Sequence, residues 1–241
     1  AVKHAIDGKA FAKAMSKGPF VTVYAGGLAR DSAFFDADAT SFFPYNPAGA
    51  NALLDGLGLT DTDGNGIRNL ANGGGDLVIN LVQNKDSENE KLIGDGLATM
   101  MAEVGIKLNL KPMEDTEPTR QSGEWDWAIS RAQQEFAFPN SGYWSEMGPV
   151  TTSSFDPHMG SDEHPQQFQP FEKEIVSILE EWRDGVEGAE AQALMSRYQK
   201  LFTENVYMPG IVQYPTALLI NKRIQNLADG MPVLAYQWAE D

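Results

Sequence analysis

The pattern of apolar and polar positions predicts a chain that alternates helices and strands. Residues 1–17 place apolar side chains at helical spacing, and Gly18-Pro19 ends that run. Asn46 and Pro47 then begin a second helix, as its cap and its first residue. Residues 77–82 are almost continuously apolar, which is typical of a strand buried on both faces of a sheet.

Residues 77–111 hold the clearest unit of the chain, a strand followed by a helix and a second strand. Ser87 and Glu90 have the spacing of a capping box, and an apolar stripe follows them up to Gly105, which ends the helix. Residues 106–111 alternate apolar and polar positions, as a half-buried strand does. Because such crossovers are right-handed and join parallel strands, we predict a βαβ unit. Two glycines inside this helix, Gly94 and Gly96, are locally unfavourable.

Irregular segments separate the remaining elements. Residues 20–47 are rich in aromatic side chains, which suits a loop packed on a core better than a free linker. Residues 132–169 also lack a sustained period, and loops of that length are usually functional or disordered. Their aromatic residues argue against disorder. Helices are predicted at 116–122, 171–183 and 190–205, and strands at 125–129, 211–214 and 217–220.

Composition narrows the class of protein. The chain has 241 residues, 42% apolar and 22% charged, and contains no apolar run of the roughly 18 residues that a transmembrane helix needs. The net charge of −16 disfavours nucleic acid and anionic lipid as partners. The absence of cysteine removes disulfides, thiolate zinc sites and cysteine nucleophiles. No linker or repeat divides the chain, and its first residues predict an uncapped helix, so we expect residues 1–241 to be a single-domain fragment or a processed chain.

Two groups of side chains are candidate metal ligands. Residues 61–72 resemble the start of a calcium loop, but Asn72 stands where a bidentate glutamate is needed, so we favour a capped acidic turn. Asp156, His158 and His164 lie close together in the long loop, where Asp162 and Glu163 add carboxylates. These types can bind zinc or support acid–base chemistry, but their spacing is unspecific and a solvated loop face is favoured. The chain contains no nucleophile elbow, P-loop or dinucleotide fingerprint.

A candidate ligand site follows the strand at 125–129. That strand would deliver polar side chains to its carboxyl end, where open α/β sheets generally bind ligands. Arg131 suits a ligand carboxylate and Glu135 a ligand amine, but the two are equally consistent with a surface ion pair. The predicted ligand-binding residues are Arg131, Gln133, Gln134, Glu135, Phe136, Phe138, Tyr143 and Trp144.

Five stretches in a fixed order make the chain resemble a known family. They are similar to stretches of the large peptide- and nickel-type solute-binding proteins of ABC transporters, which include the oligopeptide- and dipeptide-binding proteins. The stretches cover residues 5 to about 130, and the remainder matches only in its plan of a helix pair and closing strands. The matching residues are 5–10, 45–54, 59–66, 101–108 and 123–128.

The resemblance implies an α/β fold, a lobe like those of type II periplasmic binding proteins, with a mixed sheet and helices on both faces. It implies that residues 1–241 are the second, carboxyl-terminal lobe of a longer protein whose first lobe is missing and whose ligand lies between two lobes that close by hinge motion. Several members anchor a peptide amine with an acidic residue after the strand that ends in Trp-Asp-x-Ala. This chain departs from their pattern at residues 133–139, which leaves both the amine anchor and the ligand open among peptides, sugars, opines and nickel chelates.

The resemblance therefore implies a binding protein and not an enzyme. We expect it to capture a peptide or similar small solute and deliver it to ABC permease subunits, as a monomer without cofactors and without nucleic acid as a partner. The location implied is periplasmic or extracellular, with lipid anchoring left open. The alternative is a metal-dependent hydrolase that uses Asp156, His158 and His164.

Overall fold

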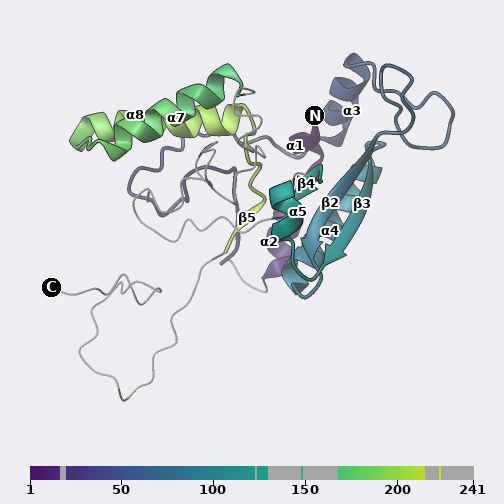
Figure 1. Cartoon of the computed structure of the whole chain (residues 1–241), viewed down its shortest axis with the longest axis horizontal. Coiled ribbons are helices and arrows are strands. Elements are labelled where there is room, and N and C mark those ends of the chain that lie inside the picture. The colour runs from purple at the N-terminus through teal and green to yellow at the C-terminus, as the bar shows by residue number, and fades with distance from the viewer. Residues whose placement is uncertain (17–19, 123, 130–147, 149–167, 215–222, 224–241) are drawn as a thin grey trace.

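A computed structural model describes residues 1–16, 20–122, 124–129, 148, 168–214 and 223 (Figure 1). Helices and strands alternate through most of this range, as the hydrophobic pattern predicts. Within the described residues, no helix combines the length and the apolar character needed to cross a bilayer. The elements are α1 (Val2–Ala5), α2 (Gly8–Met15), β1 (Thr22–Val23), α3 (Pro47–Gly56), β2 (Val78–Asn84), α4 (Glu88–Ala102), β3 (Lys107–Met113), α5 (Glu117–Ser122), β4 (Trp127–Ala128), α7 (Pro170–Arg183), α8 (Gly188–Glu204) and β5 (Val212–Gln213).

The predicted βαβ unit is confirmed. Strand β2 lies between β3 and β4 and is parallel to both, with Leu81 opposite Leu110 on one side and Trp127 on the other (Figure 1). Helix α4 connects β2 to β3 and packs on one face of this sheet. Antiparallel pairing occurs in a second sheet, in which β1 pairs with β5. The β1–β5 pair therefore joins a segment near the beginning of the described chain to one near its end.

Strand β4 is shorter than predicted. The expected strand at 125–129 is paired as β4 only at Trp127–Ala128. At its start, the Asp126 carboxylate accepts the backbone N–H of Asn80 at 2.7 Å and the Asn80 side-chain amide at 2.9 Å. The Asp126 carboxylate thus bonds to a backbone N–H that would otherwise bond to a backbone carbonyl. Regular strand pairing therefore begins one residue later, at Trp127.

The single helix predicted over residues 1–17 is wrong, because the structure divides it into α1 and α2. Asp7 lies between them, and its carboxylate accepts the backbone N–H groups of Lys9 and Ala10, both at 3.0 Å. An aspartate that satisfies these donors is a helix cap, and it begins a new helix inside an apolar pattern that continues through it.

The capping of α4 differs in part from the predicted capping box. The Ser87 hydroxyl accepts the Glu90 N–H at 3.2 Å, as expected. The Glu90 carboxylate instead accepts the N–H of Asn84 at 2.7 Å, and so ties the last residue of β2 to the first turn of the helix. At the other end, Gly105 has φ +75°, the left-handed conformation that glycine adopts most readily after a helix.

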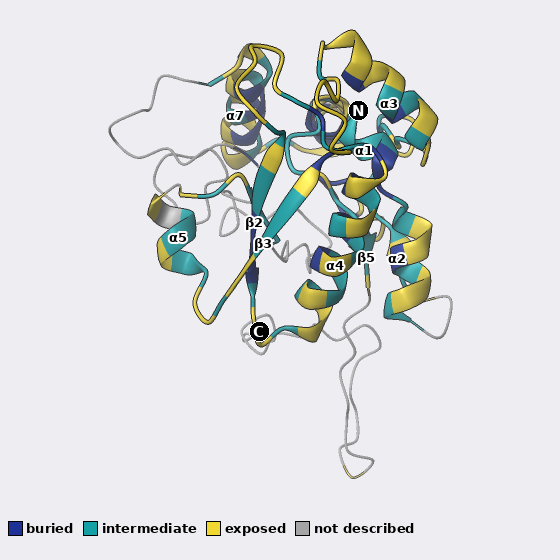
Figure 2. Cartoon of the chain, turned by 90° about the vertical axis from the view of Figure 1, so that its right-hand side faces the viewer, coloured by how far each residue is buried: buried dark blue, intermediate teal, exposed yellow. Residues whose placement is uncertain are grey.

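Buried residues, dark blue in Figure 2, include two hydrophobic core clusters. The first cluster lies between α1–α4 and the parallel sheet, and the second between α7, α8 and the irregular segment that follows β1. The first contains Ala5, Ile6, Phe11, Ala50, Leu54, Leu81, Leu97, Met101, Val104 and Ile106. The second contains Leu28, Ile175, Ile178, Leu179, Leu194, Met195, Tyr198 and Phe202.

Residues 26–41 are held on α8 by a row of polar side chains. The row lies at helical spacing, and each member bonds to the irregular segment. The Asp36 carboxylate accepts the Ser196 hydroxyl at 2.7 Å, and this bond lowers the pKa of Asp36 from its usual value. The expectation that this segment packs on a core is confirmed. The other members of the row are Gln192, which donates to Phe34 O, Gln199, which accepts from Leu28 N, and Thr203, which accepts from Ser41 N.

Lys3 joins the first helix to the segment that leads into β5. Its ammonium group donates a hydrogen bond to the carbonyl of Gly210. Gly210 in turn donates its N–H to Ala25 O at 3.2 Å, and Tyr24 donates its N–H to Ile211 O at 3.1 Å. Burial lowers the pKa of Lys3 to about 8, because the charged form loses its hydration.

Stability should therefore rise with pH through the contribution of Lys3. Between its folded pKa of about 8 and the ordinary lysine pKa of 10.5, the unfolded chain binds more protons at this lysine than the folded chain does. We expect the free energy of unfolding of the native protein, relative to Lys3→Met, to increase by about 2 kcal/mol from pH 7.5 to pH 9.5. Urea unfolding at both pH values measures this difference. Lys13→Met, at an exposed position on α2, is the control, and equal pH dependence in both variants would contradict the prediction.

Candidate functional site

The carboxyl ends of β2, β3 and β4 meet at one edge of the parallel sheet, where α/β folds commonly bind ligands. Strand β4 ends at Ala128, and the N–H of Ile129 still bonds to Val82 O at 3.0 Å. This described segment ends at Ile129, two residues before Arg131 in the sequence. The strand predicted at 125–129 therefore belongs to this sheet, and the ligand site predicted to follow it stays a prediction.

The described groups at this edge are engaged with one another. Lys85 donates its N–H to Met113 O at 2.9 Å, and the Asn84 amide donates to Glu114 O at 3.4 Å. The Lys85 ammonium lies 3.5 Å from the Asp86 carboxylate and 3.7 Å from that of Glu114. All three charged side chains are exposed, so these ion pairs contribute little to stability. They form a hydrated, charged rim beside the exit of β4.

The predicted ligand-binding residues themselves lie outside the described residues and stay predictions. The same holds for the loop cluster of the hydrolase alternative. Among the described residues, no group of three or more histidine or acidic side chains is arranged to hold a metal ion. The ligand-binding residues concerned are Arg131, Gln133, Gln134, Glu135, Phe136, Phe138, Tyr143 and Trp144, and those of the cluster are Asp156, His158 and His164.

The calcium-like loop at 61–72 has the geometry of a capped turn. The Asp61 carboxylate accepts the N–H groups of Gly66 at 2.8 Å and Gly64 at 2.7 Å. These bonds, that of Gly66 foremost, lower the pKa of Asp61. Gly66 has φ +86°, which places the sharp turn where the sequence predicts it. The carboxylate that would be the first calcium ligand thus serves the backbone of its own loop, which favours the capped turn.

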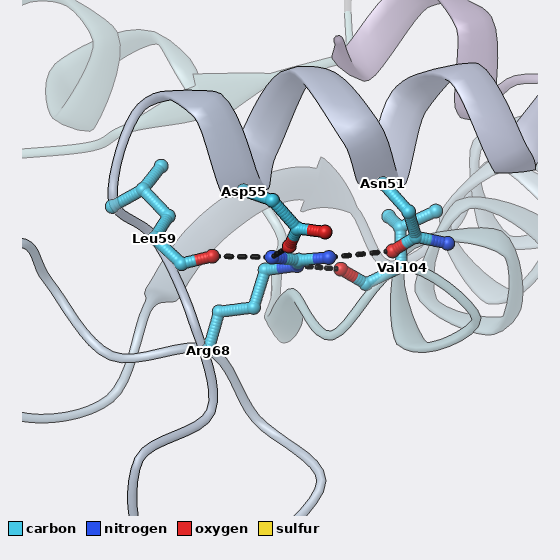
Figure 3. A network of polar contacts seen from close by, with 5 residues as sticks. All are labelled: Asn51, Asp55, Leu59, Arg68 and Val104. Carbon is cyan, nitrogen blue, oxygen red and sulfur yellow. Dashed lines mark hydrogen bonds and ion pairs between the residues drawn. The ribbon is translucent and has the colours of Figure 1, made fainter.

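Arg68, whose exposed fraction is 8%, lines a shallow pocket beside this loop, and Figure 3 shows its side chain among its polar partners. Its guanidinium donates to Val104 O at 2.7 Å, to the Asn51 amide oxygen at 2.7 Å and to the Asp55 carboxylate at 2.5 Å. It also donates to Leu59 O. Helix α3, the loop and the end of α4 are thereby held together, so the charge in this pocket has a structural use.

A third polar cluster lies where β5 meets the segment after β1. The Gln213 amide oxygen accepts the N–H of Arg30 at 3.2 Å, and its amide nitrogen donates to the Asp31 carboxylate at 2.9 Å. The Arg30 guanidinium lies 5.1 Å from the centre of the Phe42 ring, in a cation–π contact. Sequence reasoning missed this cluster. Its one local signal is an arginine within an irregular, aromatic-rich segment.

Comparison with known proteins gives the context of these sites. The family model for the middle part of bacterial extracellular solute-binding proteins of family 5 matches residues 1–153, which is more than half of the chain. A periplasmic alpha-galactoside-binding protein of Rhizobium meliloti is 34% identical over all of this chain, which covers 35% of that protein. The chain therefore spans about one third of the length of this relative.

Solved structures agree with this assignment. The periplasmic binding protein MelB of Agrobacterium fabrum, in complex with stachyose, superposes with a TM-score of 0.80 at 29% identity, over 89% of this chain and 33% of that one. The oligopeptide-binding protein AppA of Bacillus subtilis, in complex with a nonapeptide, gives a TM-score of 0.69 at 15% identity, over 89% and 40%. The likeness to MelB and AppA confirms the α/β fold expected of a periplasmic binding protein. By its sequence match along residues 1–153, the chain belongs to the bacterial extracellular solute-binding proteins of family 5, which confirms the resemblance drawn from the five stretches.

Proposed function

We propose that the complete protein containing this chain captures oligosaccharides with α-galactosyl units outside the cytoplasmic membrane and delivers them to an ABC permease. The observation that carries this proposal is the 34% identity, along the whole chain, to a periplasmic alpha-galactoside-binding protein. The likeness to MelB, whose structure holds stachyose, supports the same ligand class. The peptide favoured by the sequence resemblance is thereby replaced by a sugar.

The residues predicted to bind ligand have chemistry that suits a neutral sugar. Gln133 and Gln134 carry amides that both donate and accept hydrogen bonds, as sugar hydroxyls require of their partners. Tyr143 and Trp144 offer large apolar faces with a polar edge, which suit the mixed surface of a pyranose ring. A sugar has no charged ends, and so it does not need the amine anchor that this chain lacks in its familiar form.

The rest of the proposed protein supplies what this chain does not hold. Since the chain spans about a third of its relatives, the other part of the ligand site belongs to the remaining sequence. We infer that residues 1–241 act as one lobe, and that the ligand is enclosed when the two lobes close. The family consists of binding proteins and not of enzymes. For this protein, we propose binding without catalysis, in the periplasm or outside the cell, by a monomer that needs no cofactor.

The proposal predicts selective stabilisation by α-galactosides. A ligand present at 100 times its Kd adds about 2.7 kcal/mol to the free energy of unfolding. Raffinose and stachyose should therefore raise the melting temperature of the complete protein by several degrees, while a tripeptide and a nickel–histidine chelate should not. Differential scanning fluorimetry followed by calorimetric titration measures both effects. Stabilisation by the peptide or the chelate alone would overturn the sugar assignment and leave family membership intact.

A further inference from the structure

We propose that Arg30, Asp31, Phe42 and Gln213 form a saccharide subsite, in addition to the ligand-binding residues predicted between positions 131 and 144. This inference deepens the proposed function and rests on it. Two segments that are distant in the sequence meet at this place: the irregular segment that holds Arg30, Asp31 and Phe42, and strand β5. The fold therefore assembles a surface that no single segment provides.

The polar groups of this cluster are fixed in position before any ligand arrives. Gln213 is bonded at both ends of its amide, with Arg30 N at 3.2 Å and the Asp31 carboxylate at 2.9 Å. Each of these side-chain groups retains bonding capacity, because an amide oxygen and a carboxylate accept more than one hydrogen bond and the amide nitrogen carries two hydrogens. Side chains held by their neighbours lose little entropy when they bind a ligand.

The Arg30 guanidinium is oriented without being neutralised. Its central carbon lies 5.1 Å from the centre of the Phe42 ring, and this contact restrains the position of the group. Among the described residues it forms neither a hydrogen bond nor an ion pair, although the chain carries a net charge of −16. Its N–H donors are therefore available, and Arg30 and Phe42 are both exposed to solvent.

This set of groups matches the chemistry of a saccharide. Neighbouring hydroxyls on a sugar ring need partners that donate and partners that accept, at fixed spacing. The guanidinium donates, the Asp31 carboxylate accepts, and the Gln213 amide does both. The exposed part of the Phe42 ring offers an apolar face beside them. The Arg30 guanidinium alone would also suit a peptide carboxylate, but the Asp31 carboxylate in the same cluster disfavours a second negative charge, whereas neutral vicinal hydroxyls can bond to both groups.

Binding of stachyose to variants of the complete protein tests the subsite. Arg30→Met keeps the stem of the side chain and removes its donors, and Gln213→Met removes the amide. Because hydrogen bonds from charged groups contribute about 1.5–3 kcal/mol, we expect Arg30→Met to weaken stachyose binding by about 10- to 100-fold. Calorimetric titration gives the Kd values. Arg197→Met is the matched control, since Arg197 is an exposed arginine whose guanidinium pairs with Glu174 on the helix pair, and it should bind as the native protein does.

The outcomes separate this inference from the proposed function. If the native protein binds stachyose and both Arg30→Met and Gln213→Met bind it equally well, the subsite is wrong and the sugar assignment stands. If the native protein binds a peptide and no oligosaccharide, both are wrong. Melting temperatures of the variants without ligand exclude a general loss of folding. A loss of affinity at an unchanged melting temperature supports the subsite.

Discussion

Replacing Arg68 with leucine is expected to lower the free energy of unfolding by about 3 kcal/mol, the largest single effect that we expect from a polar residue of this chain. The guanidinium donates to the carbonyl oxygens of Leu59 and Val104, and the Arg68 side chain is almost fully buried. Leucine would leave those acceptors without partners, and each buried unsatisfied group costs about 1–3 kcal/mol. The ion pair with Asp55 adds little, because 59% of that side chain is exposed.

A control separates the buried network from charge in general. Arg197→Leu removes an arginine whose pair with Glu174 is exposed, and we expect a loss below about 1 kcal/mol. Urea unfolding of the two variants beside the native protein gives both values. If Arg68→Leu lost no more stability than Arg197→Leu, the network of Figure 3 would not hold the loop at 61–76.

Gly96→Ala should destabilise the protein by about 2 kcal/mol, although alanine is the better helix former. A β-carbon at position 96 would lie 2.5 Å from a ring carbon of Phe11, which is itself buried in the first core cluster. Forcing an extra carbon into a packed core costs about 1–3 kcal/mol, more than the 1 kcal/mol or less that helix propensity returns. Gly94→Ala should behave alike, because the Gln83 amide oxygen would lie 1.9 Å from the new carbon.

Two further variants test this explanation. Gly56→Ala, in α3, meets no atom within 4 Å, so it should stabilise the protein by up to about 1 kcal/mol. Phe11→Leu removes the ring atoms that crowd position 96, so the double variant should lose less stability than the two single variants together. Thermal and urea unfolding of Gly96→Ala, Gly56→Ala, Phe11→Leu and the double variant of Gly96 and Phe11, each beside the native protein, measure these differences. Additive losses would show that the ring contact is not the cause.

The elements and the family could be predicted from sequence because their signals are local. The cap at Ser87, the stripe of α4 and the alternation of β3 each occupy fewer than about 20 neighbouring residues, within which helical or strand periodicity is complete. The five stretches that resemble the family are equally short, so they indicate the family but not the ligand. The error at α1 and α2 is local too, since Asp7 interrupts a helix that the apolar pattern alone continues.

The candidate site was only partly accessible in this way. The parallel pairing of β2 with β3 follows from the βαβ rule, whereas the place of β4 on the other side of β2 does not. The ligand class does not follow, because it depends on which side chains from separate segments face the same space. The resemblance to the family implies a peptide, whereas the α-galactoside of the proposed function rests on the identity along the whole chain to a protein named for that ligand.

By itself, the sequence determined the order of helices and strands, the parallel βαβ unit and the membership of a binding-protein family, since each is written in the spacing of neighbouring residues. Only the tertiary structure decided three contacts. Gly96 lies against the Phe11 ring, the Arg68 guanidinium donates to Val104 O, and the N–H of Arg30 bonds to Gln213, 183 positions away in the sequence. The physical reason is that a hydrogen bond or a steric contact depends on distance in space. Residues that are far apart in the sequence but in contact in the fold produce no periodic pattern, so their contact cannot be predicted from the sequence alone.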